Sequence, residues 1–237
     1  MVSSIPRNIA EGIVELLGFQ YFSSRLNSSF PDAGCINNGG KVIPAKGNFY
    51  VKWNDQKKFP GMFVAESRGL DLLRQQKAIR IPQIAGVGER APYQFLLLEY
   101  IEQSNKSNTY WQDLGIQLAT LHNATATHFG LDHDNFIGSL LQFNQKYVSW
   151  ADFFIEQRLN VQLKSAVDNG HFTASWVKKF ELLFAKLPSL IPSEKPALLH
   201  GDLWSGNLIT DENGSPCLID PAVYFGSREA DLAMTKV

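Results

Sequence analysis

The sequence predicts an α+β fold with two lobes, an N-terminal lobe built on an antiparallel sheet and a mainly helical C-terminal lobe. Alternating and continuous apolar runs, which are typical of strands, occur between residues 49 and 98. Apolar residues at helical spacing dominate from residue 111 onward. A polar stretch separates the two patterns, so we predict lobes at 1–101 and 109–237 with a hinge or linker at 102–108.

The chain is predicted to open with a helix. Apolar residues repeat at helical spacing between Ile9 and Leu17, and Ser4 is a candidate N-cap. Pro6 suits the first turn, because its fixed φ is already helical, and Gly18 suits the point where the helix ends.

Strands and a second helix follow. A cluster of glycine and asparagine at 34–40 predicts tight turns, and Phe49–Trp53 alternates as a half-buried strand does. After Gly61, apolar residues at helical spacing between 63 and 73 predict a helix, and Glu66 falls within its apolar stripe. The apolar run at 94–101 predicts another strand.

The C-terminal lobe is predicted to hold several helices, with short strands near its end. Helices are expected over 111–121 and 176–187, and another should begin at Ser149, where Asp152 completes a variant of the capping box, and run through Leu159. Short apolar pieces at 198–199, 208–209 and 218–219 predict small strands. Asp211–Gly214 is a strong turn signal between the last two of them.

Composition excludes several classes of protein. The 22 Lys and Arg residues nearly cancel the 23 Asp and Glu residues, so no excess of positive charge marks a nucleic-acid or membrane-surface binder, and we expect neither partner. Cys35 and Cys217 lie far apart, which argues against a disulfide framework and a thiolate zinc site and favours a reducing, cytoplasmic location. No purely apolar run is longer than that of Phe95–Leu98, so no membrane-spanning or signal segment is predicted.

The stretch that carries most chemical information runs from Leu199 to Asn207. Asp202 precedes Asn207 by five residues, the spacing of the catalytic Asp and the metal-binding Asn in kinase loops, and Asp220 follows thirteen residues later. Phosphoryl transfer needs a carboxylate for the acceptor hydroxyl and hard oxygen ligands for magnesium. Each residue taken singly would be read as a turn residue, whereas the joint pattern indicates a catalytic loop. His200 is read as a brace of this loop rather than as a metal ligand.

Lys52 and Glu66 form a second constellation. A carboxylate on an apolar helical face is costly unless it is paired, and Lys52 comes from the preceding strand. Such a pair would hold an ammonium group against nucleotide phosphates. The segment 34–40 could cover phosphates with backbone N–H groups, but it matches neither of the common glycine-rich phosphate motifs.

These motifs resemble the fructosamine kinase (ketosamine kinase) family of the aminoglycoside-phosphotransferase-like superfamily. The resemblance rests on LHGDLWSGN ending at Asn207, on IDPAVY at 219–224 and on READLAMT at 228–235. It extends over nearly all of the chain, including Gly34 to Asn37, the Lys52 strand and the Glu66 helix. The fold it implies is the two-lobed, protein-kinase-like fold.

The resemblance also implies roles for single residues, with ATP and Mg²⁺ as cofactors. Asp202 would be the catalytic base, and Asn207 and Asp220 would hold magnesium. Lys52, oriented by Glu66, would contact ATP phosphates. The remaining residues of the implied site are a hinge that holds adenine through its backbone (Glu99, Tyr100 and Ile101), a phosphate-covering segment (Gly34 and Asn37) and two braces of the catalytic loop (Asp231 and His200).

The implied reaction transfers the γ-phosphoryl group of ATP, bound between the lobes, to the third-carbon hydroxyl of a ketosamine, either a small molecule or a glycated protein lysine. Trp204 is our candidate for the substrate contact, because its indole could form an apolar platform and attract the protonated amine. Ser227 departs from the histidine that the resemblance leads us to expect there. Members of the family continue through further helices, so we expect this sequence to be incomplete at its C-terminus.

Three other readings stay open at this stage. One is another small-molecule kinase of the same superfamily, acting on an aminoglycoside, choline or an unrelated sugar. A second is a metal-dependent hydrolase that uses His200, Asp202 and Asp220, and a third is a kinase-like binding module without activity. The hydrolase leaves Lys52 and Glu66 unexplained, and the binding module leaves a complete set of catalytic residues without a function. Oligomeric state and the choice between fructose- and ribulose-derived substrates are not determined by the sequence.

Overall fold

A computed structural model describes residues 5–18, 27–29, 37–43 and 47–236. The chain divides into two compact units, the first made of residues 1–117 and 206–220 and the second of residues 118–205 and 221–237. Gly34, Cys35 and Ser4, which the sequence singled out, lie outside the described residues. The lobes at 1–101 and 109–237 and the hinge between them stay a prediction.

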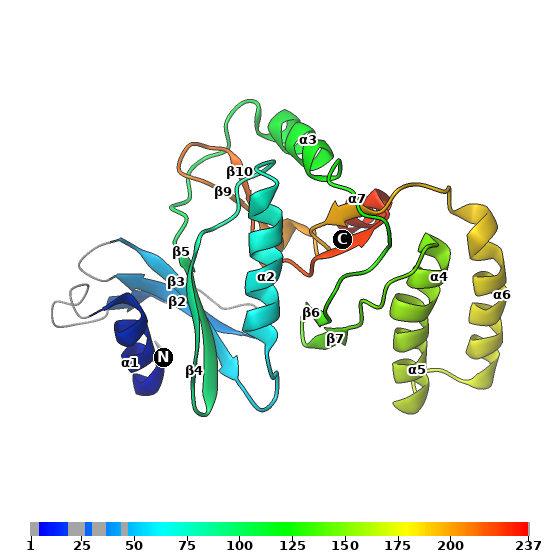
Figure 1. The fold of residues 1–237 in the computed structure, drawn as a ribbon, viewed down its shortest axis with the longest axis horizontal. Helices are drawn as coiled ribbons and strands as arrows, with labels where there is room; N and C mark the ends of the chain where they lie inside the picture. Colours follow the sequence, from blue (N-terminus) through cyan, green and yellow to red (C-terminus); the bar gives the residue numbers. More distant parts are fainter. Residues whose placement is uncertain (1–4, 19–26, 30–36, 44–46, 237) are drawn as a thin grey trace. The chain divides into compact units, whose positions relative to one another are not determined.

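The first unit is built on a five-stranded antiparallel sheet (Figure 1). Its strand order is β1-β2-β3-β5-β4. The strands are β1 (Asn27–Ser29), β2 (Asn38–Ile43), β3 (Phe49–Asp55), β5 (Tyr93–Glu99) and β4 (Ile84–Arg90). The strand predicted at 94–101 therefore ends at Glu99, which leaves Tyr100 and Ile101 in the connection that follows it.

Helix α1 (Arg7–Leu17) packs on one face of this sheet. Ile9 and Ile13 are fully buried in a core with Val42, Val51 and Trp53. Pro6 is the N-cap rather than a residue of the first turn, and Gly18 ends the helix with a φ of 84°.

Strand β4 was not predicted, because two glycines interrupt its apolar pattern. A Cβ added at Gly86 would lie 2.3 Å from Leu16 Cδ1, and one at Gly88 would lie 2.5 Å from Phe95 Cζ. Glycine at these positions lets α1 and β5 approach the strand closely. Because close packing requires glycine here, the strand lacks the apolar side chains whose alternation would have predicted it.

Helix α2 (Met62–Gln75) contacts β4 and β5. It begins after Gly61, whose φ of 73° lies in the left-handed region, and it buries Phe63, Leu70 and Leu73 fully. The helix predicted from this stripe is present, and Glu66 lies within it with a side chain that is 10% exposed.

The first unit also takes in a hairpin from late in the chain. The hairpin consists of β9 (Leu208–Thr210) and β10 (Pro216–Leu218), with Leu208 opposite Leu218. It joins the earlier part of the unit through the Leu218 N–H, which donates to the Arg80 carbonyl at 3.0 Å. Asp211–Gly214 forms the predicted turn, in which the Gly214 N–H donates to the Asp211 carbonyl. Helix α3 (Tyr110–Leu121) runs from the first unit into the second.

The second unit is mainly helical. Its elements are β6 (Asn135–Ile137), β7 (Leu140–Gln142), α4 (Trp150–Phe154), η2 (Ile155–Leu159), α5 (Asn160–Asp168), α6 (Ala174–Leu190), β8 (Ala197–Leu199), the 3₁₀ turn η3 (Ser205–Asn207) that leads out of it, β11 (Tyr224–Gly226) and α7 (Arg228–Met234). Ser149 caps α4, since its side chain accepts from the Asp152 N–H at 3.3 Å. The helix predicted from Ser149 through Leu159 is present, with a π-helical stretch at 155–159 that periodicity does not reveal.

Two apolar stripes are less buried than their periodicity predicts. Trp176 is 44% exposed and Leu183 is 38% exposed, and Leu187 is the buried residue of α6. On α3, Trp111 is 64% exposed. None of the helices in the described residues combines the length and the hydrophobicity that a membrane span requires.

Candidate active site

The centre of the site in the first unit is a buried lysine between two carboxylates. Lys52 on β3 places its Nζ 2.7 Å from Glu66 Oε1 on α2 and 3.1 Å from Asp220 Oδ1. The Lys52 side chain is 6% exposed, whereas that of Asp220 is 43% exposed. The ion pair expected from the apolar stripe is therefore formed, and its ammonium group also reaches the aspartate proposed to hold magnesium.

The charge of Lys52 is stabilised by its two partners. Burial by itself would lower the pKa of Lys52, but the negative charges of Asp220 and Glu66 outweigh it and raise that pKa above its usual value. Lys52 is thus a permanent cation at neutral pH. Tyr50 lies two residues earlier on the same strand, and burial, followed by the charge of Asp220, raises its pKa. Sequence reasoning missed Tyr50, which reads only as an alternating strand residue.

The two proposed magnesium ligands lie at the open end of the β9–β10 hairpin. Asn207 directly precedes β9, and Asp220 follows β10 by two residues. The Ile219 N–H donates to the Asn207 carbonyl at 3.1 Å, and Asn207 Nδ2 donates to the Asp220 carbonyl at 3.4 Å. Asp220 adopts a φ of 55°, a left-handed conformation that aspartate tolerates better than most residues. A carboxylate and an amide oxygen are the hard donors that magnesium prefers, so this pair fits the ion.

In the second unit, Asp231 on α7 holds the loop that carries the proposed base. Its fully buried carboxylate accepts from the His200 N–H at 2.9 Å and the Gly201 N–H at 2.9 Å, and it lies 3.0 Å from His122 Nε2. Gly201 has a φ of 81°, and a Cβ there would lie 2.0 Å from the Ala222 carbonyl oxygen. The backbone conformation of the loop at 200–201 is therefore restricted by these hydrogen bonds and by the need for glycine at 201. These contacts are those expected of a brace.

His200 is fully buried inside this loop. Its Nδ1 accepts from the Asp202 N–H at 3.4 Å, and its carbonyl accepts from the Ala222 N–H at 2.9 Å. Across the residues that the structure describes, no group of three or more His, Cys, Asp or Glu side chains could hold a metal ion.

Trp204 projects from the loop that follows Asp202. Its side chain is 44% exposed, so the indole is accessible to a substrate. Ser227, the departure from the family pattern, is buried at the N-cap of α7 and donates to Glu194. Arg228 Nε donates to the same carboxylate at 3.0 Å. Ser227 therefore helps to anchor α7, the helix that carries Asp231.

The connection after β5 is more constrained than the sequence indicates. The Glu99 N–H donates to the Gln83 carbonyl at 2.8 Å, and the Tyr100 N–H donates to the Asn48 carbonyl at 3.1 Å. Of the three N–H groups in the proposed adenine hinge, only that of Ile101 has no such backbone partner within the described residues. Adenine contact through the N–H groups of Glu99 or Tyr100 is therefore disfavoured.

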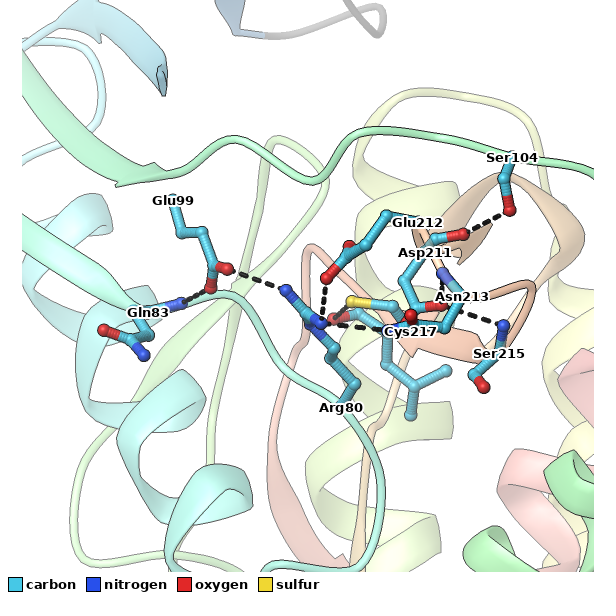
Figure 2. A network of polar contacts seen from close by, with 10 residues as sticks. Arg80, Gln83, Glu99, Ser104, Asp211, Glu212, Asn213, Ser215 and Cys217 are labelled. Atoms are coloured by element: carbon cyan, nitrogen blue, oxygen red, sulfur yellow. Dashed lines mark hydrogen bonds and ion pairs between the residues drawn. The ribbon is translucent and has the colours of Figure 1, made fainter. Parts of the chain in front are cut away.

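Arg80 is a further residue that the sequence reasoning missed. It stands between the buried residues Ile79 and Ile81, and its guanidinium lies 2.7 Å from Glu99 Oε1 and 2.8 Å from Glu212 Oε1 (Figure 2). A charged residue between two apolar ones just after a helix was the signal that could have found it.

Two remaining residues have well-defined environments. Asn37 accepts from Asn54 Nδ2 at 2.8 Å, which ties the end of the predicted phosphate-covering segment to β3. Cys217 is a free, fully buried cysteine on β10, and burial raises the pKa of its thiol to about 12. Its thiol is therefore unreactive at neutral pH.

Comparison with known proteins identifies relatives along nearly the whole chain. A family model described as fructosamine kinase matches residues 9–237. A probable ketoamine kinase of Synechocystis sp. is 39% identical over 209 residues, which make up 86% of this chain and 68% of that protein. Among the curated relatives, the matched part spans between 63 and 78% of their own length.

Solved structures show the same fold. A fructosamine-3-kinase candidate from Thermobifida fusca superposes with a TM-score of 0.84 at 31% identity, covering 98% of this chain and 79% of that one. A thermostable mutant of an aminoglycoside phosphotransferase, solved with AMP-PNP and hygromycin B, gives a TM-score of 0.66 at 16% identity over 96% of this chain and 75% of that one. The α+β, kinase-like fold expected from the sequence is thereby confirmed.

Proposed function

Because the chain belongs to the fructosamine kinase family, we propose that it transfers the γ-phosphoryl group of ATP to a sugar hydroxyl of a ketosamine. The observation that carries this proposal is the buried Lys52 between Glu66 and Asp220. A permanent cation in the site would bind the phosphates of a nucleotide, and the hydrolase reading gives this lysine no function.

The residues of the first unit supply the nucleotide contacts. Lys52, held in place by Glu66, donates to phosphate oxygens, and the Ile101 N–H is the hinge donor that the backbone contacts leave for adenine. Asn207 and Asp220 hold magnesium, which when bound neutralises charge on the phosphate oxygens. Asn37, at the end of the glycine-rich segment, helps to close over the phosphates.

The residues of the second unit supply the acceptor chemistry. Asp202 orients the acceptor hydroxyl and takes its proton as the oxygen bonds to phosphorus and the bond from phosphorus to the leaving oxygen of ADP breaks. Asp231 and His200 hold the loop in the required path. Following the family resemblance, we propose the third carbon of the sugar as the site of transfer. On a glycated lysine, such a phosphorylation would destabilise the adduct and act as repair in the cytoplasm.

The test is ADP formation that depends on a ketosamine. Purified protein with Mg²⁺ and ATP is expected to release ADP when a fructosyl- or ribulosyl-amine is added, and not when the matching free sugar, an aminoglycoside or choline is added. ADP release with choline or an aminoglycoside alone would indicate another small-molecule kinase. ATP binding without release for any acceptor would indicate a binding module.

Replacing Asp220 with asparagine is expected to weaken Mg-ATP binding by about tenfold or more, because the metal loses a charged ligand. The measurement is the Kd for ATP by calorimetry with Mg²⁺ and with EDTA. The parent should bind more tightly with Mg²⁺, whereas the variant should lose most of that difference. The same Mg²⁺ dependence in both proteins would exclude Asp220 as a ligand.

Replacing Trp204 with leucine is expected to lower the preference for a ketosamine over its free sugar. A cation–π contact to the protonated amine is worth about 0.5–2 kcal/mol, so the ratio of the two kcat/KM values should fall several-fold to tens-fold. Trp176→Leu is the matched control, because Trp176 is also 44% exposed but lies on α6. A ratio that is equal in the parent and in the Trp204 variant would remove Trp204 from substrate recognition.

A further inference from the structure

A network of charged groups joins the end of strand β5 to the turn of the β9–β10 hairpin (Figure 2). Arg80 is its centre. Its Nη2 donates to Glu99 Oε1 at 2.7 Å, and its Nη1 donates to Glu212 Oε1 at 2.8 Å and to Asp211 Oδ2 at 3.4 Å. Arg80 thereby links its own segment and Glu99 to Asp211, which follows Arg80 by 131 residues in the sequence.

The hairpin side of the network is held as a rigid turn. Asp211 is 3% exposed, and its Oδ1 accepts from the N–H groups of Asn213 at 2.9 Å and Ser215 at 2.8 Å. Ser104 Oγ donates to the Asp211 carbonyl at 2.7 Å, and the Ser107 N–H donates to the Gly214 carbonyl at 3.0 Å. The connection after β5 is thus hydrogen-bonded to the turn of the hairpin. Asn207 and Asp220 lie at the opposite, open end of the same hairpin.

The other side of the network ends at the proposed adenine hinge. Glu99 uses its second oxygen, Oε2, to accept from the Gln83 N–H at 3.0 Å, and its own N–H donates to the Gln83 carbonyl. Both carboxylate oxygens are therefore engaged, and the residue that starts the hinge is fixed in position. Ile101 follows two residues later.

We propose that Arg80 is a positioning residue that sets the spacing between the adenine hinge and the hairpin that carries Asn207 and Asp220. The inference rests on the proposed function, because it assumes that adenine binds the hinge and Mg-phosphate binds the hairpin. Mg-ATP must reach both at once, so its affinity depends on how well their spacing is held. A ligand that touches the hinge alone does not depend on that spacing.

The chemistry of arginine suits this role. Its planar fork presents N–H groups in two directions at fixed angles, whereas a lysine offers one compact charge on a flexible stem. Arg80 uses that fork to reach Glu99 with one nitrogen and Glu212 with the other. Lysine can satisfy either carboxylate, but it does not fix the distance between them.

A purely structural ion pair would behave differently. The Arg80 side chain is 30% exposed and that of Glu212 is 46% exposed, and pairs of this kind contribute little to stability. If that were the whole role of Arg80, its replacement would leave the affinities for adenosine and for Mg-ATP unchanged.

The test compares two ligands on the full chain. Calorimetry should give the Kd of adenosine, which reaches only the hinge, and the Kd of Mg-ATP, which reaches both parts. For Arg80→Lys and Arg80→Ala we expect the Kd of Mg-ATP to rise about tenfold, since the two contacts are no longer held at one spacing. The Kd of adenosine should stay within about twofold of the parent value.

Two further variants sharpen the result. Arg7→Ala is the matched control, because it removes a guanidinium whose ion pair with Glu11, at 2.8 Å, lies within helix α1. Glu212→Gln removes the hairpin partner alone, and its effect on Mg-ATP should not add to that of Arg80→Ala. Arg7→Ala should bind both ligands as the parent does.

The outcomes separate the two proposals. Equal weakening of adenosine and Mg-ATP would mean that Arg80 shapes the hinge only, and unchanged binding of both would reduce it to an ion pair; either result overturns the inference. Additive effects of Arg80→Ala and Glu212→Gln would also overturn it. A parent protein that binds adenosine but not Mg-ATP would refute the proposed function itself.

Discussion

Replacing Asp202 with asparagine is expected to lower kcat for ketosamine phosphorylation about 10²- to 10⁴-fold, the usual contribution of a positioned general base. The amide keeps the size of the side chain and loses the ability to take a proton. Because Asp202 takes the proton only in the transition state, the substitution should change the Kd for Mg-ATP by no more than about twofold. Steady-state kinetics and calorimetry on the same preparation measure both quantities.

Asp168→Asn is the control for this change, because Asp168 is an exposed aspartate at the end of α5. It should keep the parent kcat. A kcat for Asp202→Asn within about tenfold of the parent would be incompatible with its role as the base. Equal losses in kcat and in Mg-ATP affinity would instead mean that the substitution disturbs the loop.

Replacing Lys52 with methionine is expected to damage both activity and stability. The phosphate contact is lost, which should lower kcat/KM by about 10²-fold or more. The Glu66 carboxylate, 10% exposed, loses its partner at 2.7 Å. Removing one member of a buried pair costs about 3 kcal/mol of unfolding free energy, measurable by urea denaturation.

A double variant separates the two effects. In Lys52→Met/Glu66→Met the unpaired charge is replaced by an apolar side chain of similar length, so most of the lost stability should return. Activity should stay low, because no cation faces the phosphates. Recovery of activity in the double variant would show that Lys52 serves only to neutralise Glu66.

The stability difference between parent and Lys52→Met should grow as pH rises above about 5. Burial, followed by the charge of Asp220, already raises the pKa of Glu66 in the folded parent, and Lys52 is the group that lowers it. Without Lys52 the pKa of Glu66 rises further, so the folded variant loses stability as pH rises from the unfolded glutamate pKa of about 4.3 to that raised value. Urea midpoints of the two proteins should therefore lie closer together at about pH 5 than at about pH 8, and a difference that is the same at both values would contradict a charged, unpaired Glu66 in the variant.

Local patterns were sufficient for part of the site. Glu66 could be predicted to have a partner because a carboxylate within an apolar helical stripe needs one, and Lys52 is its partner at 2.7 Å. The cap at Ser149 and the turn at 211–214 were also readable, because their chemistry lies within four residues. The roles of the site residues in catalysis stay predictions.

Long-range placement was not readable from the sequence. Nothing local to Arg80 reveals that its partners lie at Glu99, Asp211 and Glu212, because pairing over such distances is decided by tertiary packing. The occupied N–H groups of Glu99 and Tyr100 depend on neighbouring segments in the same way. The apolar stripe of α6 predicted burial, yet Trp176 is 44% exposed, since periodicity indicates a face but not what covers it.

The discontinuous first unit has a consequence for synthesis on the ribosome. Residues 206–220 belong to it, although the rest of the unit ends at residue 117. While the intervening chain is being made, Arg80 can engage Glu99 but neither Asp211 nor Glu212 has yet been translated. The earlier part of the first unit must therefore form without the hairpin, and the segment at Arg80, which later pairs with β10, stays without this partner until residues 206–220 have left the exit tunnel. The nucleotide site is completed only after residues 206–220 have been made, long after the rest of the first unit.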